Sequence, residues 1–237
     1  MRADQEPFMT DPQSSPLILA LPKGRILKAL RPVLEHTGFE PAPDCLDESS
    51  RRLRFPTSQP SLDVVRVRSF DVATFVAYGG ADIGVCGADV LMEFDYPDLY
   101  APLDLGIGGC RISVARLKGG GEVMPEGRSR LRVATKYPAI ARRYFASRAV
   151  NAEIVHLHGA MELAPALDMA DVIVDLVDTG STLRANGLEE VDVIAQVTSR
   201  LIVNRVALKT RPEEINGLIE QFRLALPQLA QSGEKVS

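Results

Sequence analysis

Tryptophan is absent from this sequence of 237 residues, and aromatic residues make up only 5% of it. The core is therefore expected to be aliphatic, and a hydrophobic content of 46% is enough to form one. No apolar run approaches the ~20 residues that a membrane span needs. Residues 1–15 carry Asp4, Glu6 and Asp11 and lack the apolar segment of a signal peptide. We therefore expect a flexible extension over 1–16, no membrane association and a cytoplasmic location.

Cysteine is scarce, and its three positions, Cys45, Cys86 and Cys110, are widely spaced. An odd number without a paired motif predicts reduced thiols and not a disulfide framework. His156 and His158 would share one face of a strand, but no nearby cysteine completes a site, so we predict no protein-bound metal. The net charge of −4 argues against nucleic acid as a partner, although a local group of arginines can still bind a small anion.

Short apolar segments alternate with helical patterns from Leu17 onward. The predicted strands are 17–21, 63–68, 81–86, 112–117, 131–134, 153–157, 171–177 and an extended segment over 192–204. The predicted helices are 26–38 with a kink or restart at Pro32, one capped by Ser69 that ends at 79–80, 138–148, 161–169, and one that starts at Pro212. This alternation predicts an α/β fold with mostly parallel sheets covered on both faces.

The glycine-rich segment 104–109 predicts a hinge, and a second crossing near 196–200 would return the chain to its first half. The predicted parts are lobe I (17–105 plus 198–228), lobe II (106–197) and a polar tail (229–237). Two lobes joined by two crossovers match the type II periplasmic-binding-protein architecture, with a ligand cleft between the lobes.

The strongest local signal is the sequence DTGSTL at 178–183, which follows a predicted buried strand. Gly180 allows a tight turn in which successive backbone N–H groups converge on phosphate oxygens. The hydroxyls of Thr179, Ser181 and Thr182 add donors, and a helical turn after the loop adds partial positive charge. The segment therefore predicts a phosphate site. The alternative is an ordinary strand-to-helix turn with a Ser/Thr cap.

Two carboxylates flank this loop, at Asp175 and Asp178. They would repel a phosphate, but they suit the vicinal hydroxyls of a ribose as acceptors. The predicted ligand is therefore a sugar phosphate, with its phosphate at one end of the loop and its diol at the other.

Basic residues form a second signal. Lys23 and Arg25 leave the first strand at the end where ligands bind in α/β sheets, and a second group contains Arg51, Arg52 and Arg54. Guanidinium groups bind phosphate oxygens bidentately and stay charged. The alternative for the second group is a solvated charged surface.

Two glycines around the strand at 81–89, Gly84 and Gly87, would allow close approach by a flat ligand. A structural turn is the alternative there, and Glu162 is a lone acid with no meaning by itself.

Together these segments resemble the ATP phosphoribosyltransferase family, in the family's order and over nearly all of 17–226. The matching segments are LPKGR at 21–25, SRRLRFPT at 50–57, RSFDV at 68–72, ADIG at 81–84 with Gly87 and Asp89, ELAP at 162–165, and 170–183 with Asp175 and TGSTL. The family usually has glycine where this chain has Asp168, and aspartate tolerates the left-handed conformation better than most residues.

The resemblance implies a glycosyltransferase that joins adenine N1 of ATP to C1 of 5-phosphoribosyl 1-pyrophosphate (PRPP), releasing pyrophosphate in the first step of histidine biosynthesis. It also implies Mg²⁺ on the pyrophosphate group. The implied site residues are Arg25, Arg51 and Lys23 for the leaving pyrophosphate; Thr179, Gly180, Ser181 and Thr182 for the 5-phosphate; Glu162 and Asp175, with Asp178, for the ribose; and Asp71, Gly87 and Asp89 beside ATP.

The chain also resembles the short form of the family, which pairs with a regulatory subunit similar to histidyl-tRNA synthetase. The resemblance implies a homodimer within such a hetero-oligomer.

Two other classes of protein remain open on the sequence. A non-catalytic solute-binding protein would share the two lobes and the hinge, but it needs no arginines on both sides of a cleft. A purine- or pyrimidine-salvage phosphoribosyltransferase would carry an adjacent acidic pair before Thr-Gly on a single domain, whereas apolar residues separate Asp175 from Asp178 here.

Overall fold

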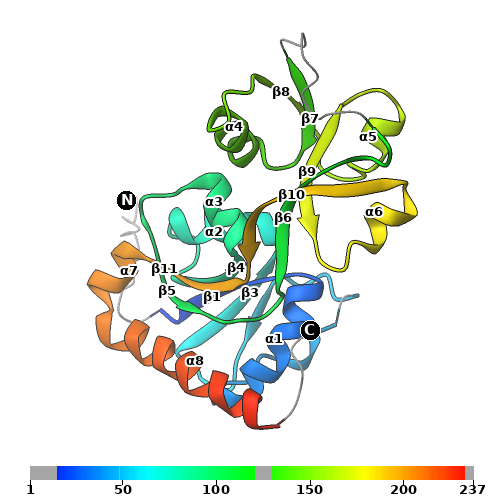
Figure 1. Cartoon of the computed structure of the whole chain (residues 1–237). Coiled ribbons are helices and arrows are strands. Elements are labelled where there is room, and N and C mark those ends of the chain that lie inside the picture. Colours follow the sequence, from blue (N-terminus) through cyan, green and yellow to red (C-terminus); the bar gives the residue numbers. More distant parts are fainter. Residues whose placement is uncertain (1–14, 48, 121–129, 233–237) are drawn as a thin grey trace, which may run out of the picture. The chain divides into compact units, whose positions relative to one another are not determined.

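The computed structural model describes residues 15–47, 49–120 and 130–232, and helices and strands alternate along them (Figure 1). The predicted extension over 1–16, the glycine-rich turn at 119–121 and the tail at 229–237 lie wholly or partly outside the described residues. The chain divides into two compact units, which are described separately. Among the described residues, unit 1 contains 15–47, 49–86, 97–105 and 200–232, and unit 2 contains 87–96, 106–120 and 130–199.

Unit 1 is built on a six-stranded sheet in the order β2-β3-β1-β4-β11-β5. Its strands are β1 (Leu17–Pro22), β2 (Arg54–Pro56), β3 (Leu62–Val67), β4 (Ile83–Gly87), β5 (Leu99–Asp104) and β11 (Ser199–Asn204). β1 pairs in parallel with β3 and β4, and β2 and β5 are antiparallel edge strands. β1 is apolar almost throughout and nearly completely buried, as expected of a central strand covered on both faces.

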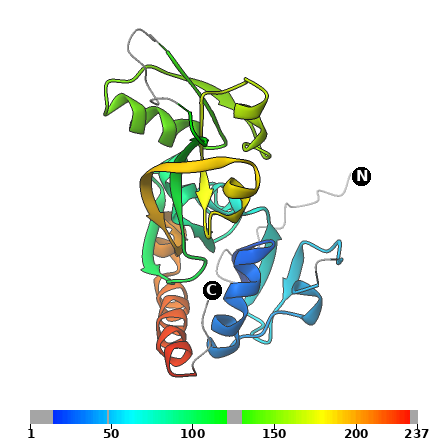
Figure 2. The same ribbon diagram turned by 45° about the vertical axis from the view of Figure 1, so that its right-hand side comes forward.

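The helices of unit 1 present aliphatic stripes to the sheet and to each other. They are α1 (Arg25–His36), α2 (Ser69–Ala77), α7 (Arg205–Thr210) and α8 (Pro212–Ser232), with a short 3₁₀ turn at Pro43–Cys45. Helix α8 packs against α1, as both views show (Figure 1, Figure 2). The ring centroids of Phe39 and Phe222 lie 5.9 Å apart.

Two details of these helices differ from the sequence predictions. Helix α1 continues through Pro32, so the restart predicted as one alternative there is absent, and the kink stays a prediction. Leu30, Val33 and Leu34, on both sides of the proline, are buried in one stripe. The predicted cap at Ser69 is wrong, since Arg68 occupies the N-cap position of α2 and no side chain caps it. Ser69 is instead the first helical residue.

Unit 2 contains a five-stranded mixed sheet in the order β10-β6-β9-β7-β8. Its strands are β6 (Cys110–Leu117), β7 (Leu131–Thr135), β8 (Ala152–His156), β9 (Val172–Val177) and β10 (Leu188–Val197). Its helices are α3 (Ala88–Phe94), α4 (Pro138–Ala146), α5 (Leu163–Ala166) and α6 (Ser181–Ala185). β7 is parallel to β8 and β9, whereas β6 is antiparallel to β9 and β10. The predicted α/β class is confirmed, with parallel pairs at the centre of one sheet and in one half of the other.

The helix predicted over 161–169 is reduced to the single turn of α5. Positive φ angles at Ala160 and Asp168 bound this turn, at 53° and 55°. Asp168 thus adopts the left-handed conformation, which aspartate tolerates better than most residues. Arg132 fixes it by donating from Nη1 to the Asp168 carbonyl at 2.6 Å and from Nη2 to its carboxylate at 2.8 Å.

Helix α3 belongs to unit 2, although the predicted lobe I extends to 105. Two acidic side chains of α3 attach it to α4 and the residue before it. The Tyr137 hydroxyl donates to the Asp89 carboxylate at 2.6 Å, and the Glu93 carboxylate accepts from the backbone N–H groups of Ala139 and Ile140 at 2.8 and 3.0 Å. The segment predicted as extended over 192–204 likewise divides into β10 and β11, which lie in different sheets.

The buried hydrogen bond between Tyr137 and Asp89 predicts a stability effect. Tyr137→Phe should lower the free energy of unfolding by about 1.5–3 kcal/mol, because a carboxylate that is 5% exposed loses a donor. Urea unfolding measures this loss. Tyr144→Phe is the matched control and should cost less, since its partner Asp192 is 44% exposed. Equal losses in the two variants would contradict the claim that the buried hydrogen bond to Asp89 stabilises the fold more than the exposed one to Asp192.

No helix within the described residues has the length and apolar character needed to cross a membrane.

Candidate active site

The loop at 178–180 connects β9 to α6 and is organised by its own residues. Gly180 has φ 72° and ψ 11°, in the left-handed region that favours glycine. The Thr179 hydroxyl donates to Ser181 Oγ at 3.0 Å and accepts from the Ser181 N–H at 3.3 Å. Thr179, Ser181 and Thr182 are exposed, and the hydroxyls of Ser181 and Thr182 are accessible as donors to a ligand.

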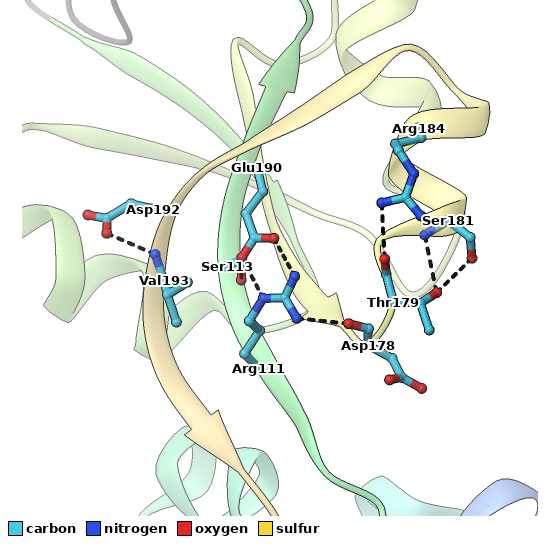
Figure 3. Close-up of polar contacts among 9 residues, drawn as sticks. All are labelled: Arg111, Ser113, Asp178, Thr179, Ser181, Arg184, Glu190, Asp192 and Val193. Carbon is cyan, nitrogen blue, oxygen red and sulfur yellow. Dashed lines mark hydrogen bonds and ion pairs between the residues drawn. The ribbon is translucent and has the colours of Figure 1, made fainter. Parts of the chain in front are cut away.

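Two arginines hold successive carbonyl groups of this loop (Figure 3). Arg111 Nη1 donates to the Asp178 carbonyl at 2.8 Å, and Arg184 Nη1 donates to the Thr179 carbonyl at 3.0 Å. In a planar trans peptide the N–H points away from the carbonyl of the preceding residue. The N–H groups of Thr179 and Gly180 therefore point away from the two guanidiniums. Each of these two peptide units thus directs its N–H group away from the arginine that binds its carbonyl.

Arg111 is itself fixed by a carboxylate of the neighbouring strand. Its Nε and Nη2 donate to Glu190 Oε1 and Oε2 at 2.6 and 2.5 Å, and the Ser113 hydroxyl donates to the same carboxylate at 2.8 Å. These bonds hold the pKa of Glu190 below its usual value. The Asp178 carboxylate points away from the Arg111 guanidinium (Figure 3), so this arginine orients the loop backbone and leaves that carboxylate to other partners.

Arg111 and Glu190 were not among the predicted site residues. Their pairing joins β6 to β10, strands that are far apart in the sequence, so no local motif indicates it. The only sequence signal is the alternation of Arg111 and Ser113 on one face of a strand.

The orienting role of Arg111 predicts a specific kinetic defect. For PRPP, the substrate that the family resemblance implies, Arg111→Met should raise the KM by about tenfold to a hundredfold, because the released Asp178 carbonyl lets the loop donors move out of position. The KM for ATP should change little. The matched control is Arg116→Met, which removes an Arg–Glu pair of 3.0 Å from the same two strands but leaves the loop untouched. Equal effects of the two substitutions on the KM for PRPP would contradict the role.

Asp175 lies near the end of β9, next to the loop, and its side chain is 15% exposed. Lys136 Nζ is 3.4 Å from its Oδ1, and the N–H of Leu176 donates to Oδ1 at 2.8 Å. Burial raises the pKa of Asp175, Lys136 opposes that shift, and the charge of Glu162 adds to it. The charge of Glu162 thus acts on Asp175 within unit 2, and a ribose site that the two share stays a prediction. Lys136 was not predicted.

The predicted residues Lys23 and Arg25 lie at the start of α1 in unit 1. The Lys23 N–H donates to the Val67 carbonyl at 2.9 Å, which joins the ends of the parallel strands β1 and β3. Gly24 between them has φ 81°. A cavity of about 270 Å³ is lined by Lys23, Gly24, Leu27 and Arg66.

Arg66 also determines the path of the segment that leads to Arg51. It is 2% exposed, and its guanidinium donates to the carbonyls of Cys45, Asp47 and Ser50 at 2.7, 2.7 and 2.8 Å. Arg51 directly follows Ser50 and is exposed. The backbone before the predicted catalytic arginine is therefore held on β3.

The other two arginines of this predicted group have surface ion pairs. Arg52 contacts Asp44 at 3.1 Å, and Arg54 contacts Asp63 at 2.7 Å. This arrangement matches the solvated surface that the sequence left open for the group. Exposed pairs of this kind contribute little to stability.

The three residues predicted beside ATP differ in exposure. Asp71 is exposed in the first turn of α2. Gly87 is buried, and a Cβ there would lie 2.0 Å from Asp89 Oδ1, so any other residue would displace the Asp89 carboxylate. The Asp89 carboxylate is engaged by Tyr137. Contact of any of the three with ATP stays a prediction.

Among residues 15–47, 49–120 and 130–232, no three His, Cys, Asp or Glu side chains are grouped as a metal site. The ring centroids of His156 and His158 lie 4.8 Å apart, but β8 ends at His156, so the prediction that the two share one face of a strand is wrong. All three cysteines are free thiols, and burial raises the pKa of Cys45 to about 11.

Comparison with known proteins identifies the family. The sequence profile of ATP phosphoribosyltransferase matches residues 68–224. The chain is 83% identical over 212 residues to the ATP phosphoribosyltransferase of Gluconobacter oxydans (90% of this chain, 88% of the relative). It is 59% identical to that of Paramagnetospirillum magneticum (88% of this chain, 96% of the relative).

Among solved structures, the ATP phosphoribosyl transferase (HisG:HisZ) complex from Thermotoga maritima matches with a TM-score of 0.77 and 34% identity, over 90% of this chain and 99% of that chain. A putative L-cystine ABC transporter from Listeria monocytogenes matches with a TM-score of 0.60 and 11% identity, over 92% of each chain. The second match shows only a shared fold and supports the predicted resemblance to periplasmic binding proteins. The chain belongs to the ATP phosphoribosyltransferase family, and it is a pentosyltransferase that condenses ATP with PRPP in histidine biosynthesis.

Proposed function

We propose that the loop at 178–183 binds the 5-phosphate of PRPP. The observation that supports this most is the capture of the Asp178 and Thr179 carbonyls by Arg111 and Arg184. The N–H group of each of these peptide units then points away from the arginine that binds its carbonyl, and it can donate to the phosphate together with the neighbouring hydroxyls. The loop carries no lysine, so binding rests on amide and hydroxyl donors, which suit a phosphate dianion.

The ribose hydroxyls are assigned to Asp175 and Glu162, with Asp178 beside the loop. Ionised carboxylates accept hydrogen bonds and donate none, so each suits the two adjacent O–H donors of a ribose. The position of Asp175 at the end of the strand that leads into the loop supports this order of diol and phosphate.

Arg25 and Arg51, with Lys23, are assigned to the leaving pyrophosphate. Displacement at a sugar C1 passes through an oxocarbenium-like state, in which negative charge grows on the departing group. Cationic donors aimed at that charge act mainly in the transition state. Adenine N1 attacks with its own lone pair, so the reaction needs no general base to remove a proton from it.

Mg²⁺ is assigned to the pyrophosphate group of the substrate, where it neutralises part of the charge. The predicted site residues on the pyrophosphate side are cations, which bind phosphate oxygens and not a metal ion. The described residues contain no cluster of three Asp, Glu, His or Cys side chains that could hold the metal. The protein would then bind the sugar, and the substrate would bring the metal.

Asp71, Gly87 and Asp89 are assigned to the ATP side. Asp71 is exposed and able to accept from the nucleotide. Gly87 and Asp89 are assigned to shaping the backbone on this side, since the Asp89 carboxylate occupies the space that a side chain at position 87 would need.

The chain is proposed to be the short form of the enzyme, a homodimer that assembles with a regulatory subunit similar to histidyl-tRNA synthetase, in the cytoplasm. The match over 99% of the Thermotoga maritima chain, from a HisG:HisZ complex, supports this form. Co-purification with such a subunit, with activity measured in its presence and absence, tests the assembly.

Calorimetry with three ligands separates the assigned roles. Ribose 5-phosphate carries the diol and the 5-phosphate, inorganic pyrophosphate represents the leaving group, and PRPP combines them. Asp175→Asn should weaken the binding of PRPP and of ribose 5-phosphate but leave the affinity for pyrophosphate unchanged. Arg51→Ala should weaken the binding of PRPP and of pyrophosphate but leave the affinity for ribose 5-phosphate unchanged. The opposite pattern would contradict the assignment.

A further inference from the structure

Lys136 follows the carboxyl end of β7, beside the strand that carries Asp175. The register pairs Thr135 with Val174, which places the next residue of each strand side by side. The Lys136 and Asp175 side chains are 25% and 15% exposed, and their charged atoms lie 3.4 Å apart. Lys136 Nζ also lies 5.0 Å from the centroid of the Tyr137 ring. A pair this withdrawn from water interacts more strongly than a surface pair.

Other charged and polar groups approach Asp175 from the surrounding elements. Glu162 at the start of α5 adds a like charge. From β6, Ser113 lies opposite Asp175 in the strand register, and its hydroxyl donates to Glu190 of β10. Glu190 is neutralised by its bidentate contact with Arg111. Lys136 is thus a cation in direct contact with a carboxylate that has acidic neighbours.

The Tyr137 hydroxyl does not compete for this carboxylate. It donates to Asp89, and burial, followed by the charge of Asp89, raises the pKa of Tyr137 so that the phenol stays neutral. The N–H of Leu176 on its own strand also donates to Asp175.

We propose that Lys136 is a further positioning residue of the sugar site, whose ammonium holds the Asp175 carboxylate charged and oriented for the ribose hydroxyls. Lys136 has this role only if Asp175 binds the ribose, as proposed above. Ionised Asp175 accepts from both hydroxyls of a diol, whereas the protonated acid adds a donor where an acceptor is needed. Lys136 opposes the rise in the pKa of Asp175 that burial causes.

The pH dependence of kcat/KM for PRPP tests this role. As the pH falls through the pKa of Asp175, ribose binding should be lost, which gives an acid limb. Without Lys136 the pKa of Asp175 rises, so Lys136→Met should move the midpoint of that limb upward by about 1 pH unit or more. Lys136→Arg keeps the charge and should keep the midpoint. A lysine that only stabilised the fold would lower activity at every pH without moving the midpoint.

Three further variants complete the test. Lys209→Met removes an exposed lysine from α7 of unit 1 and should leave the profile unchanged. Lys136→Gln keeps a donor without the charge and should shift the limb as methionine does, which covers the case of an unstable methionine variant. An unmoved midpoint in folded Lys136→Gln would overturn the role of Lys136. Wild-type PRPP affinity in Asp175→Asn would instead remove the ribose assignment itself, so the two failures are distinguishable.

Discussion

Arg25→Ala and Arg51→Ala are each expected to lower kcat about a hundredfold while the protein stays folded. A donor aimed at developing charge in a transition state is worth about 3 kcal/mol, which corresponds to that loss. The leaving pyrophosphate gains charge only as the C1–O bond breaks, so kcat should fall more than KM rises. Steady-state assays with ATP and PRPP, following product absorbance, measure both parameters.

Arg52→Ala is the matched control for Arg51→Ala. The two arginines are neighbours in the same segment, but Arg52 is engaged with Asp44 at 3.1 Å and its side chain is 60% exposed. Its removal should leave kcat near the wild-type value. Wild-type-like turnover in both Arg25→Ala and Arg51→Ala would remove the leaving-group assignment. A loss in Arg52→Ala as large as that in Arg51→Ala would point to general attraction by the basic segment.

Gly180→Val is expected to abolish detectable binding of PRPP. A β-branched residue is strained at φ 72°, and its Cβ would lie 3.1 Å from Arg184 Nη1. Arg184 would then have to shift by a few tenths of an ångström, which weakens its bond to the Thr179 carbonyl and disturbs the orientation of the loop donors. Misplacing such donors by about 1 Å costs on the order of a hundredfold, and valine adds bulk beside the phosphate. Calorimetry with PRPP measures the loss.

Gly187→Val separates backbone strain from loop function. Gly187 has the same φ of 72°, but no atom lies within 4 Å of the position of its Cβ. This variant should lose stability and keep its affinity for PRPP. A folded Gly180→Val protein with unchanged PRPP affinity would count against the phosphate loop, as would equal losses of affinity in the two variants.

Features set by local sequence could be predicted. The apolar run of β1, the tight turn at Gly180 and the left-handed Asp168 each follow from the preferences of a few consecutive residues. The positions of the chemical groups at 178–183 follow for the same reason, since one strand and one loop carry them all.

Features set by distant residues could not be predicted. Arg111 and Glu190 are separated by 79 positions, and only the antiparallel pairing of β6 with β10 brings them together. Lys136 has no motif of its own, and the register of β7 with β9 places it beside Asp175. Helix α3 belongs to unit 2 because two of its carboxylates find donors from Tyr137 and the start of α4. None of these pairings has a local signature.

The structure of the enzyme crystallised with PRPP tests the phosphate loop most directly. We predict that the oxygens of the sugar's 5-phosphate accept hydrogen bonds from backbone N–H groups at 179–182, while Arg111 and Arg184 keep the carbonyls behind them. Density for the 5-phosphate at another place, with this segment left in contact only with solvent, would contradict the assignment and leave the family's reaction without its proposed anchor.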